Sequence, residues 1–212
     1  MIITVFGATG KVGKQIVKAC LNDGHSVRAY GRNVFTSNFR EEPPLALFPG
    51  TLFDEEAVFN VLKGSDAVLS AIGGAMDGTD KSRSLGMKNI VHQMERAGVE
   101  RIINLGGLGI LEDPTKVHGE LIMDSDNFPL HYYNVAKEHL EAYKYLNSSS
   151  LKWTFICAPE IVYEGPTGKY VTAANQQPAN NHYHINAGDI ALFMVDELQK
   201  NEYIRVKVGI SN

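Results

Sequence analysis

Short runs of apolar and β-branched residues alternate with longer segments in which apolar residues return every three or four positions. The short runs predict buried β-strands, and the longer segments predict amphipathic helices. The expected strands cover residues 2–6, 26–30, 45–48, 67–71, 101–105 and 153–157. The expected helices cover residues 12–22, 55–62, 85–97 and 135–146.

This alternation favours an α/β fold with a doubly wound, mostly parallel sheet and helices on both faces. Parallel strands need crossover connections, and both faces of the sheet that they form must be covered. The 212 residues contain no evident linker, so we expect a single domain over residues 1–212. Less regular stretches lie at 33–44, 73–84, 106–129 and 163–184, and the last three are the expected substrate-side loops.

The first predicted strand runs directly into the sequence GATGKVG at residues 7–13. Glycines here allow a tight turn, close approach of a phosphate to bare backbone, and close packing of helix on strand. The amides and the positive end of the dipole of the following helix would then face the phosphates. The pattern predicts a dinucleotide-binding turn, whose expected contacts are Gly7, Thr9, Gly10, Lys11, Val12 and Gly13.

The end of the second predicted strand carries a cation where an NAD-binding enzyme would carry a carboxylate. Residues 27–33 read VRAYGRN, so no acidic side chain is placed to accept a hydrogen bond from the ribose 2′-hydroxyl. Arg32 is placed to pair with a 2′-phosphate. The sequence therefore favours NADP(H) over NAD(H).

The fourth predicted strand ends in small residues at the same edge of the sheet. We expect Ala71, Ile72 and Gly73 to let the cofactor ribose lie against the backbone, although an ordinary loop start is an equal alternative. His182 and His184 alternate, but no carboxylate or thiolate accompanies them, so no metal site is expected.

Composition and the first residues of the chain indicate which binding partners and which cellular compartment to expect. Lys and Arg number 20 against 24 Asp and Glu, a formal net charge of -4, which argues against general binding to nucleic acid or anionic membranes. Cys20 and Cys157 lie in apolar segments without CxxC spacing and are expected to be reduced core thiols. The first residues lack the basic leader of a signal peptide, so we expect a cytoplasmic protein, a monomer or weak homodimer.

Four stretches of the chain resemble the atypical short-chain dehydrogenases/reductases that include the NmrA-like proteins and the biliverdin-IXβ and flavin reductases. They are FGATG at 6–10, DPTKV at 113–117, GPTGKY at 165–170 and GDIALFM at 188–194. The resemblance implies a Rossmann-like fold, NADP(H) as hydride carrier, and a planar acceptor stacked on the nicotinamide.

Three departures from this group concern the substrate side. The serine that the group often has at the end of the fifth strand is Gly107 here, and the histidine after the Pro-Pro of the reductase is Glu160. The acidic residue that relatives use near the adenine is Thr51. Biliverdin is therefore not the expected substrate.

Tyr133 and Lys137 have the spacing of the short-chain dehydrogenase catalytic pair. Four residues place them on one helix face, where Lys137 could lower the pKa of the tyrosine and also hold the ribose. An inward-packed aromatic ring beside a solvated lysine would give the same spacing.

The favoured interpretation is an NADPH-dependent reductase that delivers hydride to a planar acceptor such as a flavin or quinone, whose protonation can come from solvent. One alternative is a carbonyl reductase or epimerase that uses Tyr133 and Lys137. The other is a non-catalytic, NmrA-like protein that senses the NADP redox state.

Overall fold

A computed structural model describes residues 1–116 and 119–212. In these residues the strands are β1 (Ile2–Phe6), β2 (Ser26–Gly31), β3 (Leu45–Pro49), β4 (Ala67–Ser70), β5 (Arg101–Gly107), β6 (Lys152–Ala158), β7 (Glu160–Val162), β8 (Val171–Ala174), β9 (His184–Asn186) and β10 (Val206–Ser211). The helices are α1 (Lys11–Asn22), α2 (Glu55–Leu62), α3 (Ser82–Ala97), α4 (Leu130–Ser148) and α5 (Ala187–Lys200), with 3-10 turns η1 (Val34–Thr36), η2 (Leu108–Ile110) and η3 (Ile122–Asp124).

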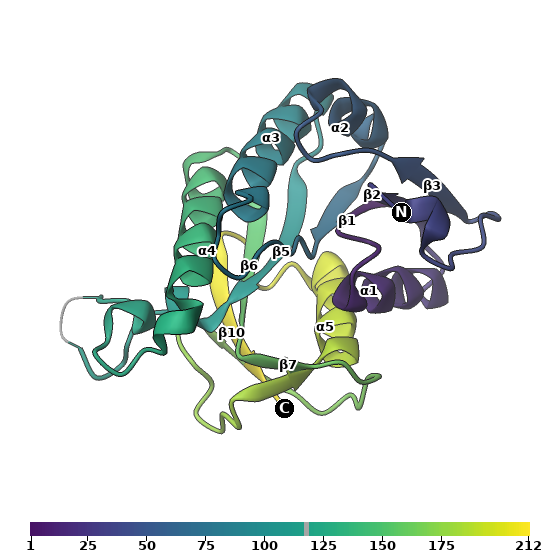
Figure 1. Cartoon of the computed structure of the whole chain (residues 1–212). Helices are drawn as coiled ribbons and strands as arrows, with labels where there is room; N and C mark the ends of the chain where they lie inside the picture. Colours follow the sequence, from purple (N-terminus) through teal and green to yellow (C-terminus); the bar gives the residue numbers. More distant parts are fainter. Residues whose placement is uncertain (117–118) are drawn as a thin grey trace.

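The main sheet of the described residues has eight strands in the order β3-β2-β1-β4-β5-β6-β10-β8 (Figure 1). Neighbouring strands from β3 to β10 are parallel, and β8 at the far edge is antiparallel to β10. The chain runs from β1 outward to β3 and then returns to β4 on the other side of β1. The carboxyl ends of β1 and β4 therefore flank the switch point, where such sheets bind ligands.

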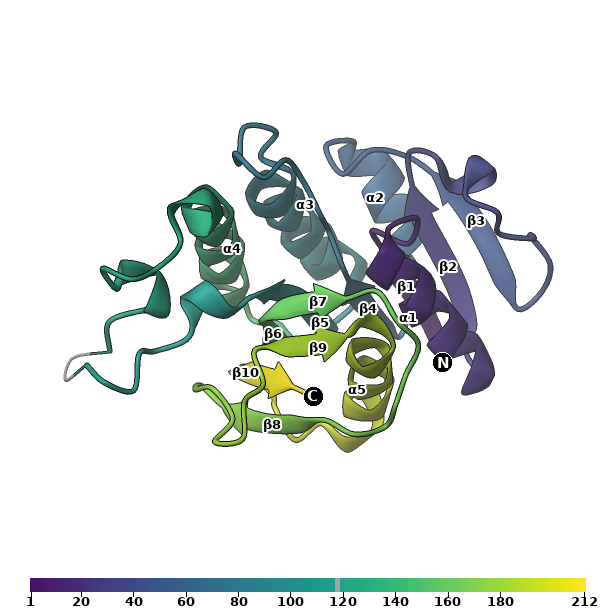
Figure 2. The same ribbon diagram turned by 60° about the horizontal axis from the view of Figure 1, so that its bottom comes forward.

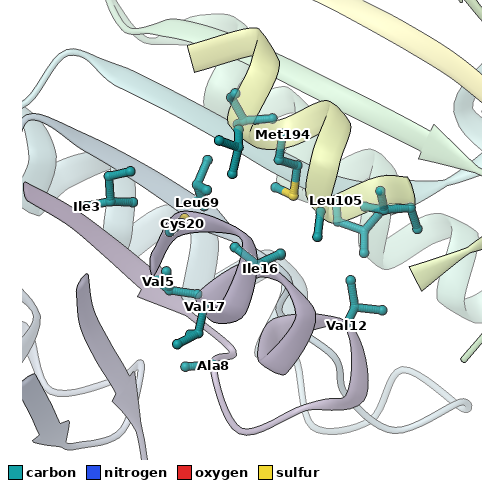
Figure 3. Packing of buried hydrophobic residues seen from close by; sticks show 14 of the residues in the cluster. Ile3, Val5, Ala8, Val12, Ile16, Val17, Cys20, Leu69, Leu105 and Met194 are labelled. Carbon is teal, nitrogen blue, oxygen red and sulfur yellow. The ribbon is translucent and has the colours of Figure 1, made fainter. Parts of the chain in front are cut away.

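Helices cover both faces of this sheet, as the doubly wound prediction requires. Helices α1 and α5 pack together on one face, and α2, α3 and α4 lie in a row on the other (Figure 2). Strand residues alternate between the two cores, so that Leu69 faces α1 and α5 while Val68 faces the row of three helices. Figure 3 shows the first core, in which Ile16 of α1 and Met194 of α5 pack beside strand side chains. The Rossmann-like α/β fold is confirmed.

The sequence located the first six strands to within two residues but missed elements in the last third of the chain. Helix α5 was not predicted, because six consecutive apolar residues at 190–195 hide its helical period. Strands β7 to β10 were also missed, and β8 and the start of β9 lie in the expected loop 163–184.

Helix boundaries also differ from the predicted ones. Helix α4 begins at Leu130 rather than 135, since an 86% exposed Leu130 interrupts the amphipathic pattern. Helix α3 begins at Ser82, inside the expected loop 73–84. Residues 106 and 107, expected to start a loop, complete β5.

Candidate functional site

Glycines shape the turn between β1 and α1. Gly7 has a φ of +75°, in the left-handed region that favours glycine. A Cβ atom on Gly7 would collide with the carbonyl oxygen of Ala71, and one on Gly13 would collide with the carbonyl oxygen of Gly7. Bare backbone at Gly7 therefore lets the turn lie against the end of β4, and bare backbone at Gly13 lets α1 pack onto the turn.

The first turn of α1 leaves its amides available to a ligand. Gly10 is the N-cap, and among the described residues no side chain caps the helix and no acidic residue lies in its first turn. The amide of Gly10 donates to the carbonyl oxygen of Gly7 at 3.0 Å, which closes the turn beneath the helix end. Free amides and the positive end of the helix dipole favour an anionic group at this point.

A cleft of about 240 Å³ opens at the carboxyl ends of four strands. Its lining comes from the ends of β1 to β4 and the start of α3: Gly7, Thr9, Gly10, Tyr30, Gly31, Arg32, Gly50, Thr51, Leu52, Phe53, Ala71, Ile72, Gly73 and Ser82. The predicted cofactor-binding residues that the structure brings together here are Gly7, Thr9, Gly10, Arg32, Ala71, Ile72 and Gly73. The cleft thus spans the switch point from the end of β3 to the end of β4.

Three other predicted turn residues lie behind or beside this lining. Val12 and Gly13 are buried in α1 and support the turn from below. Lys11 is exposed, and its Nζ lies 4.1 Å from the centroid of the Tyr163 ring. Tyr163 belongs to the loop that follows β7, so this contact joins the late loop to the phosphate-binding turn.

The two arginines of β2 and its end have different environments. Arg28 is anchored to the end of α2, where its Nη1 donates to the carbonyl oxygens of Val61 at 2.8 Å and Lys63 at 2.6 Å. Arg32 is exposed at the rim of the cleft, and no salt bridge between described residues involves it. The Arg32 guanidinium is therefore available to an anion in the cleft.

The wall formed by β2 and β3 was not foreseen as part of the site, although Thr51 had been noted. The hydroxyl of buried Tyr30 donates to the carbonyl oxygen of Thr51 at 2.9 Å, and its ring packs edge-on against Phe6 at 5.2 Å. Burial, together with the charge of Asp54, raises the pKa of Tyr30 to about 12, so the phenol remains a donor. Phe53 is 52% exposed at this rim. Thr51 and Phe53 closely follow β3, and this place after a parallel strand is the sequence signal that could have identified them.

Buried polar contacts hold the loop after β4. The Arg83 guanidinium donates to the carbonyl oxygens of Gly74 and Ala75, each at 3.1 Å. Glu138 of α4 accepts from the Ser84 hydroxyl at 2.7 Å and pairs with Lys81 at 2.9 Å. Burial alone would raise the pKa of Glu138, but the bonds from Ser84 and Lys81 outweigh it and lower the pKa. The loop is therefore fixed between the cleft and α4.

A single buried carboxylate holds the late loop. Asp189, at the start of α5, accepts hydrogen bonds from the amides of Thr167 and Gly168 and the hydroxyl of Thr167, all at 2.8 Å. Asn212 donates to the same carboxylate at 2.7 Å. A Cβ on Gly188 would collide with the backbone at Gly165 and Pro166. Two separate stretches that carry the family resemblance, 165–170 and 188–194, thus meet in space.

Tyr133 and Lys137 lie side by side, as their spacing predicts. The Nζ of exposed Lys137 is 4.6 Å from the centroid of the half-buried Tyr133 ring. Neither residue is part of the cleft lining. Their catalytic role, and the contact of Lys137 with a cofactor, remain predictions.

A histidine from α4 lies beside Gly107 at the end of β5, the position at which the related group often has a serine. A Cβ on Gly107 would lie 3.2 Å from Cδ2 and 3.6 Å from Nε2 of His139, which projects from α4. Burial and then the charge of Arg83 lower the pKa of His139 to about 3, so its imidazole is neutral at physiological pH. His139 was missed because no local motif marks it.

The remaining candidates take no part in the cleft. Cys20 and Cys157 are buried free thiols, and burial raises the pKa of each. In residues 1–116 and 119–212 no three His, Cys, Asp or Glu side chains gather as a metal site would require, and no helix has the length and apolarity to cross a bilayer. Of the stretch 113–117, Val117 lies outside the described residues.

Comparison with protein families gives a match over most of the chain. The family model described as NAD(P)H-binding matches residues 7–201. The uncharacterized protein YwnB of Bacillus subtilis (strain 168) is 29% identical over 212 residues, which cover 96% of this chain and 94% of that protein.

Two solved structures resemble the whole fold. A candidate exported protein from Burkholderia pseudomallei superposes with a TM-score of 0.84 at 30% identity, covering 100% of both chains. A candidate NADH-flavin reductase from Streptococcus pneumoniae TIGR4 superposes with a TM-score of 0.84 at 27% identity, covering 100% of this chain and 99% of the other.

Proposed function

Because the chain belongs to the NAD(P)H-binding oxidoreductase family, we propose that it is an NADPH-dependent reductase that delivers hydride to a planar acceptor such as a flavin or quinone. The observation that carries this proposal is the cleft in which the glycine turn, Arg32 and the small residues after β4 meet. The candidate flavin reductase from Streptococcus pneumoniae supports the acceptor class. The choice of NADPH over NADH rests on Arg32.

The residues of the cleft fit a dinucleotide. The turn around Gly7 is a cradle that a Cβ would fill, and the open amides at the start of α1 suit a diphosphate. Arg32 at the rim suits a 2′-phosphate, because its planar donors match phosphate oxygens. The backbone of Ala71 to Gly73 leaves room for the second ribose.

When bound, the dinucleotide supplies a hydride. The protein's own part is to orient that end of the cofactor, to hold a flat acceptor against it, and to exclude water. The loops fixed by Arg83 and Asp189 flank the sheet edge and suit this positioning role. A flavin or quinone can take its proton from solvent, so this chemistry needs no serine at position 107.

Calorimetric titration of NADPH and NADH tests the cofactor assignment. Arg32→Ala should weaken NADPH binding about 30-fold, the loss of roughly 2 kcal/mol of charge-assisted hydrogen bonding, and should leave NADH binding nearly unchanged. Arg40→Ala is the matched control, because Arg40 is exposed in the same loop and pairs with Glu42 at 3.3 Å. Equal affinity of the wild type for both dinucleotides would refute the preference.

The loss of nicotinamide absorbance with a panel of flavins and quinones tests the reaction. We expect turnover with at least one of these acceptors and little effect of Tyr133→Phe. The contact between Lys137 and Tyr133 supports a second candidate, a carbonyl reductase or epimerase, in which Tyr133→Phe would abolish turnover. Gly107 in place of serine keeps a third candidate open, a non-catalytic NADP sensor, which would bind the cofactor tightly without oxidising it.

A further inference from the structure

The end of β5 is the next strand end beyond the lining of the cleft. Ser70, the last residue of β4, pairs with Asn104 of β5, and Gly73 and Gly107 each follow this pair by three residues, Gly73 in the loop after β4 and Gly107 at the end of β5. Parallel strands are about 4.8 Å apart. A ligand that extends from the cleft across the end of β4 therefore reaches the end of β5.

Neither Gly73 nor Gly107 carries a side chain. A Cβ on Gly73 would meet no atom within 4 Å, and the nearest atoms to a Cβ on Gly107 belong to His139. The imidazole of His139 is thus the polar side chain that the structure places beside the bare backbone of Gly107.

Helix geometry explains why His139, and not Lys137, meets β5. Residues two apart in a helix are rotated by about 200°, so His139 projects away from the side of Lys137. Ala136 and Tyr143, on the same side as His139, are packed into the core beneath α4.

The imidazole of His139 can form further hydrogen bonds. Neither of its ring nitrogens bonds another described residue, and the residue is mostly buried but retains some exposed surface. Burial and the Arg83 charge keep the ring neutral, so it carries one donor and one acceptor. A neutral imidazole can donate to a carbonyl oxygen without bringing a charge into the site.

We propose that His139 binds the hydride acceptor, with its imidazole donating a hydrogen bond to a ring carbonyl of a flavin at the end of β5. This inference rests on the proposed reductase function and names the residue that orients the acceptor. The histidine supplies, from α4, the polar contact that a hydroxyl on β5 would otherwise make.

Riboflavin binding to the full chain saturated with NADP⁺ tests this, read as quenching of flavin fluorescence and so independent of turnover. Removing the hydrogen bond in His139→Ala should weaken riboflavin binding about tenfold. The double variant Gly107→Ser/His139→Ala, which restores a hydroxyl in the vacated space, should recover most of that loss. His131→Ala, an exposed histidine on the first turn of the same helix, is the control and should bind riboflavin like the wild type.

Adenosine 2′,5′-bisphosphate separates the possible failures, because it reports on the adenosine end of the cleft alone. Its affinity should be equal in the wild type and all variants, which also shows that they are folded. Unchanged riboflavin binding in His139→Ala, a parallel loss of bisphosphate binding, or no recovery in the double variant would overturn the role of His139 alone. A wild type that binds the bisphosphate but no riboflavin would overturn the flavin-reductase function and this inference together.

Discussion

Asp189 offers the sharpest test of how the late loop is held. Its Oδ1 accepts from the amides of Thr167 and Gly168, and its Oδ2 accepts from the Thr167 hydroxyl and the Asn212 amide. The side chain is completely buried. The carboxylate is therefore satisfied by these protein donors and not by water.

The substitution Asp189→Asn changes only the Oδ2 side. The amide oxygen can keep both bonds of Oδ1, and the Thr167 hydroxyl can rotate to accept from the new NH₂ group. Asn212, in contrast, would present a donor to a donor. The loss of one charge-assisted bond should reduce the free energy of unfolding by roughly 2 kcal/mol, because Asn212 is partly exposed and keeps its bond to the carbonyl oxygen of Lys169 at 2.6 Å. For a chain of this size, that corresponds to a fall in Tm of roughly 4 to 8 °C.

The assay is urea unfolding of both proteins at several pH values. Burial alone would raise the pKa of Asp189, but its hydrogen bonds outweigh this and lower it in the folded protein. A lowered folded pKa means that the carboxylate stabilises fully above its unfolded pKa of about 3.9 and loses this contribution as pH falls through the folded value. The gap between wild type and Asp189→Asn should thus be constant near pH 7 and shrink below about pH 4.

Glu141→Gln on α4 is the control, because Glu141 lies away from the late loop. Its carboxylate is 47% exposed and lies 2.6 Å from Lys144, so the change in free energy should stay within about 0.5 kcal/mol. An Asp189→Asn protein as stable as the wild type at pH 7 would refute this account of the loop, as would a deficit that persists undiminished in acid.

Two further substitutions compare the glycine turn, where both stability and NADPH binding should change, with the opposite edge of the sheet, where only stability should change. Gly13→Ala drives a Cβ into the carbonyl oxygen of Gly7. We expect thermal melting to show a loss of about 1–3 kcal/mol of stability, and calorimetry to show at least tenfold weaker NADPH binding. Unaltered NADPH binding would show that the turn can adjust. Glu197→Gln leaves the buried guanidinium of Arg101, now paired at 2.8 Å, without its counter-charge. Urea unfolding of Glu197→Gln should show a free energy of unfolding lower by about 3–5 kcal/mol. The folded variant should bind NADPH like the wild type, because the pair of Arg101 and Glu197 lies at the amino edge of the sheet, opposite the cleft.

The strand ends that face the cleft could be predicted because they are defined by backbone. Gly7 and Gly13 occupy positions where a side chain would collide with carbonyl groups, and such positions are recognisable in the sequence as glycines. Arg32 follows from the same logic, since its place is counted from the end of a strand. In a parallel sheet these ends come together whatever the surface residues are.

The late part of the chain was harder for a physical reason. Helix α5 packs against α1 and is buried on most sides, so its sequence lacks the polar face that identifies an amphipathic helix. Strands β7 and β9 have three residues each, too few to show a period. Strand β9 is held by Asn212, whose side-chain oxygen accepts from the amide of Asn186, and β7 pairs with β9; neither contact is local in sequence.

His139 marks the limit of reasoning from motifs. The sequence shows that position 107 lacks a hydroxyl, which by itself suggests that the site has lost one polar contact to its ligand. Helix α4 reaches that strand end from more than thirty residues away along the chain and brings an imidazole to the vacant place. The absence of a side chain at one position therefore says nothing about the chemistry available there until packing is known. A glycine in place of a catalytic residue can also leave room for a side chain from another element. At the end of β5 the structure favours this second interpretation, because Gly107 leaves room for His139 of α4.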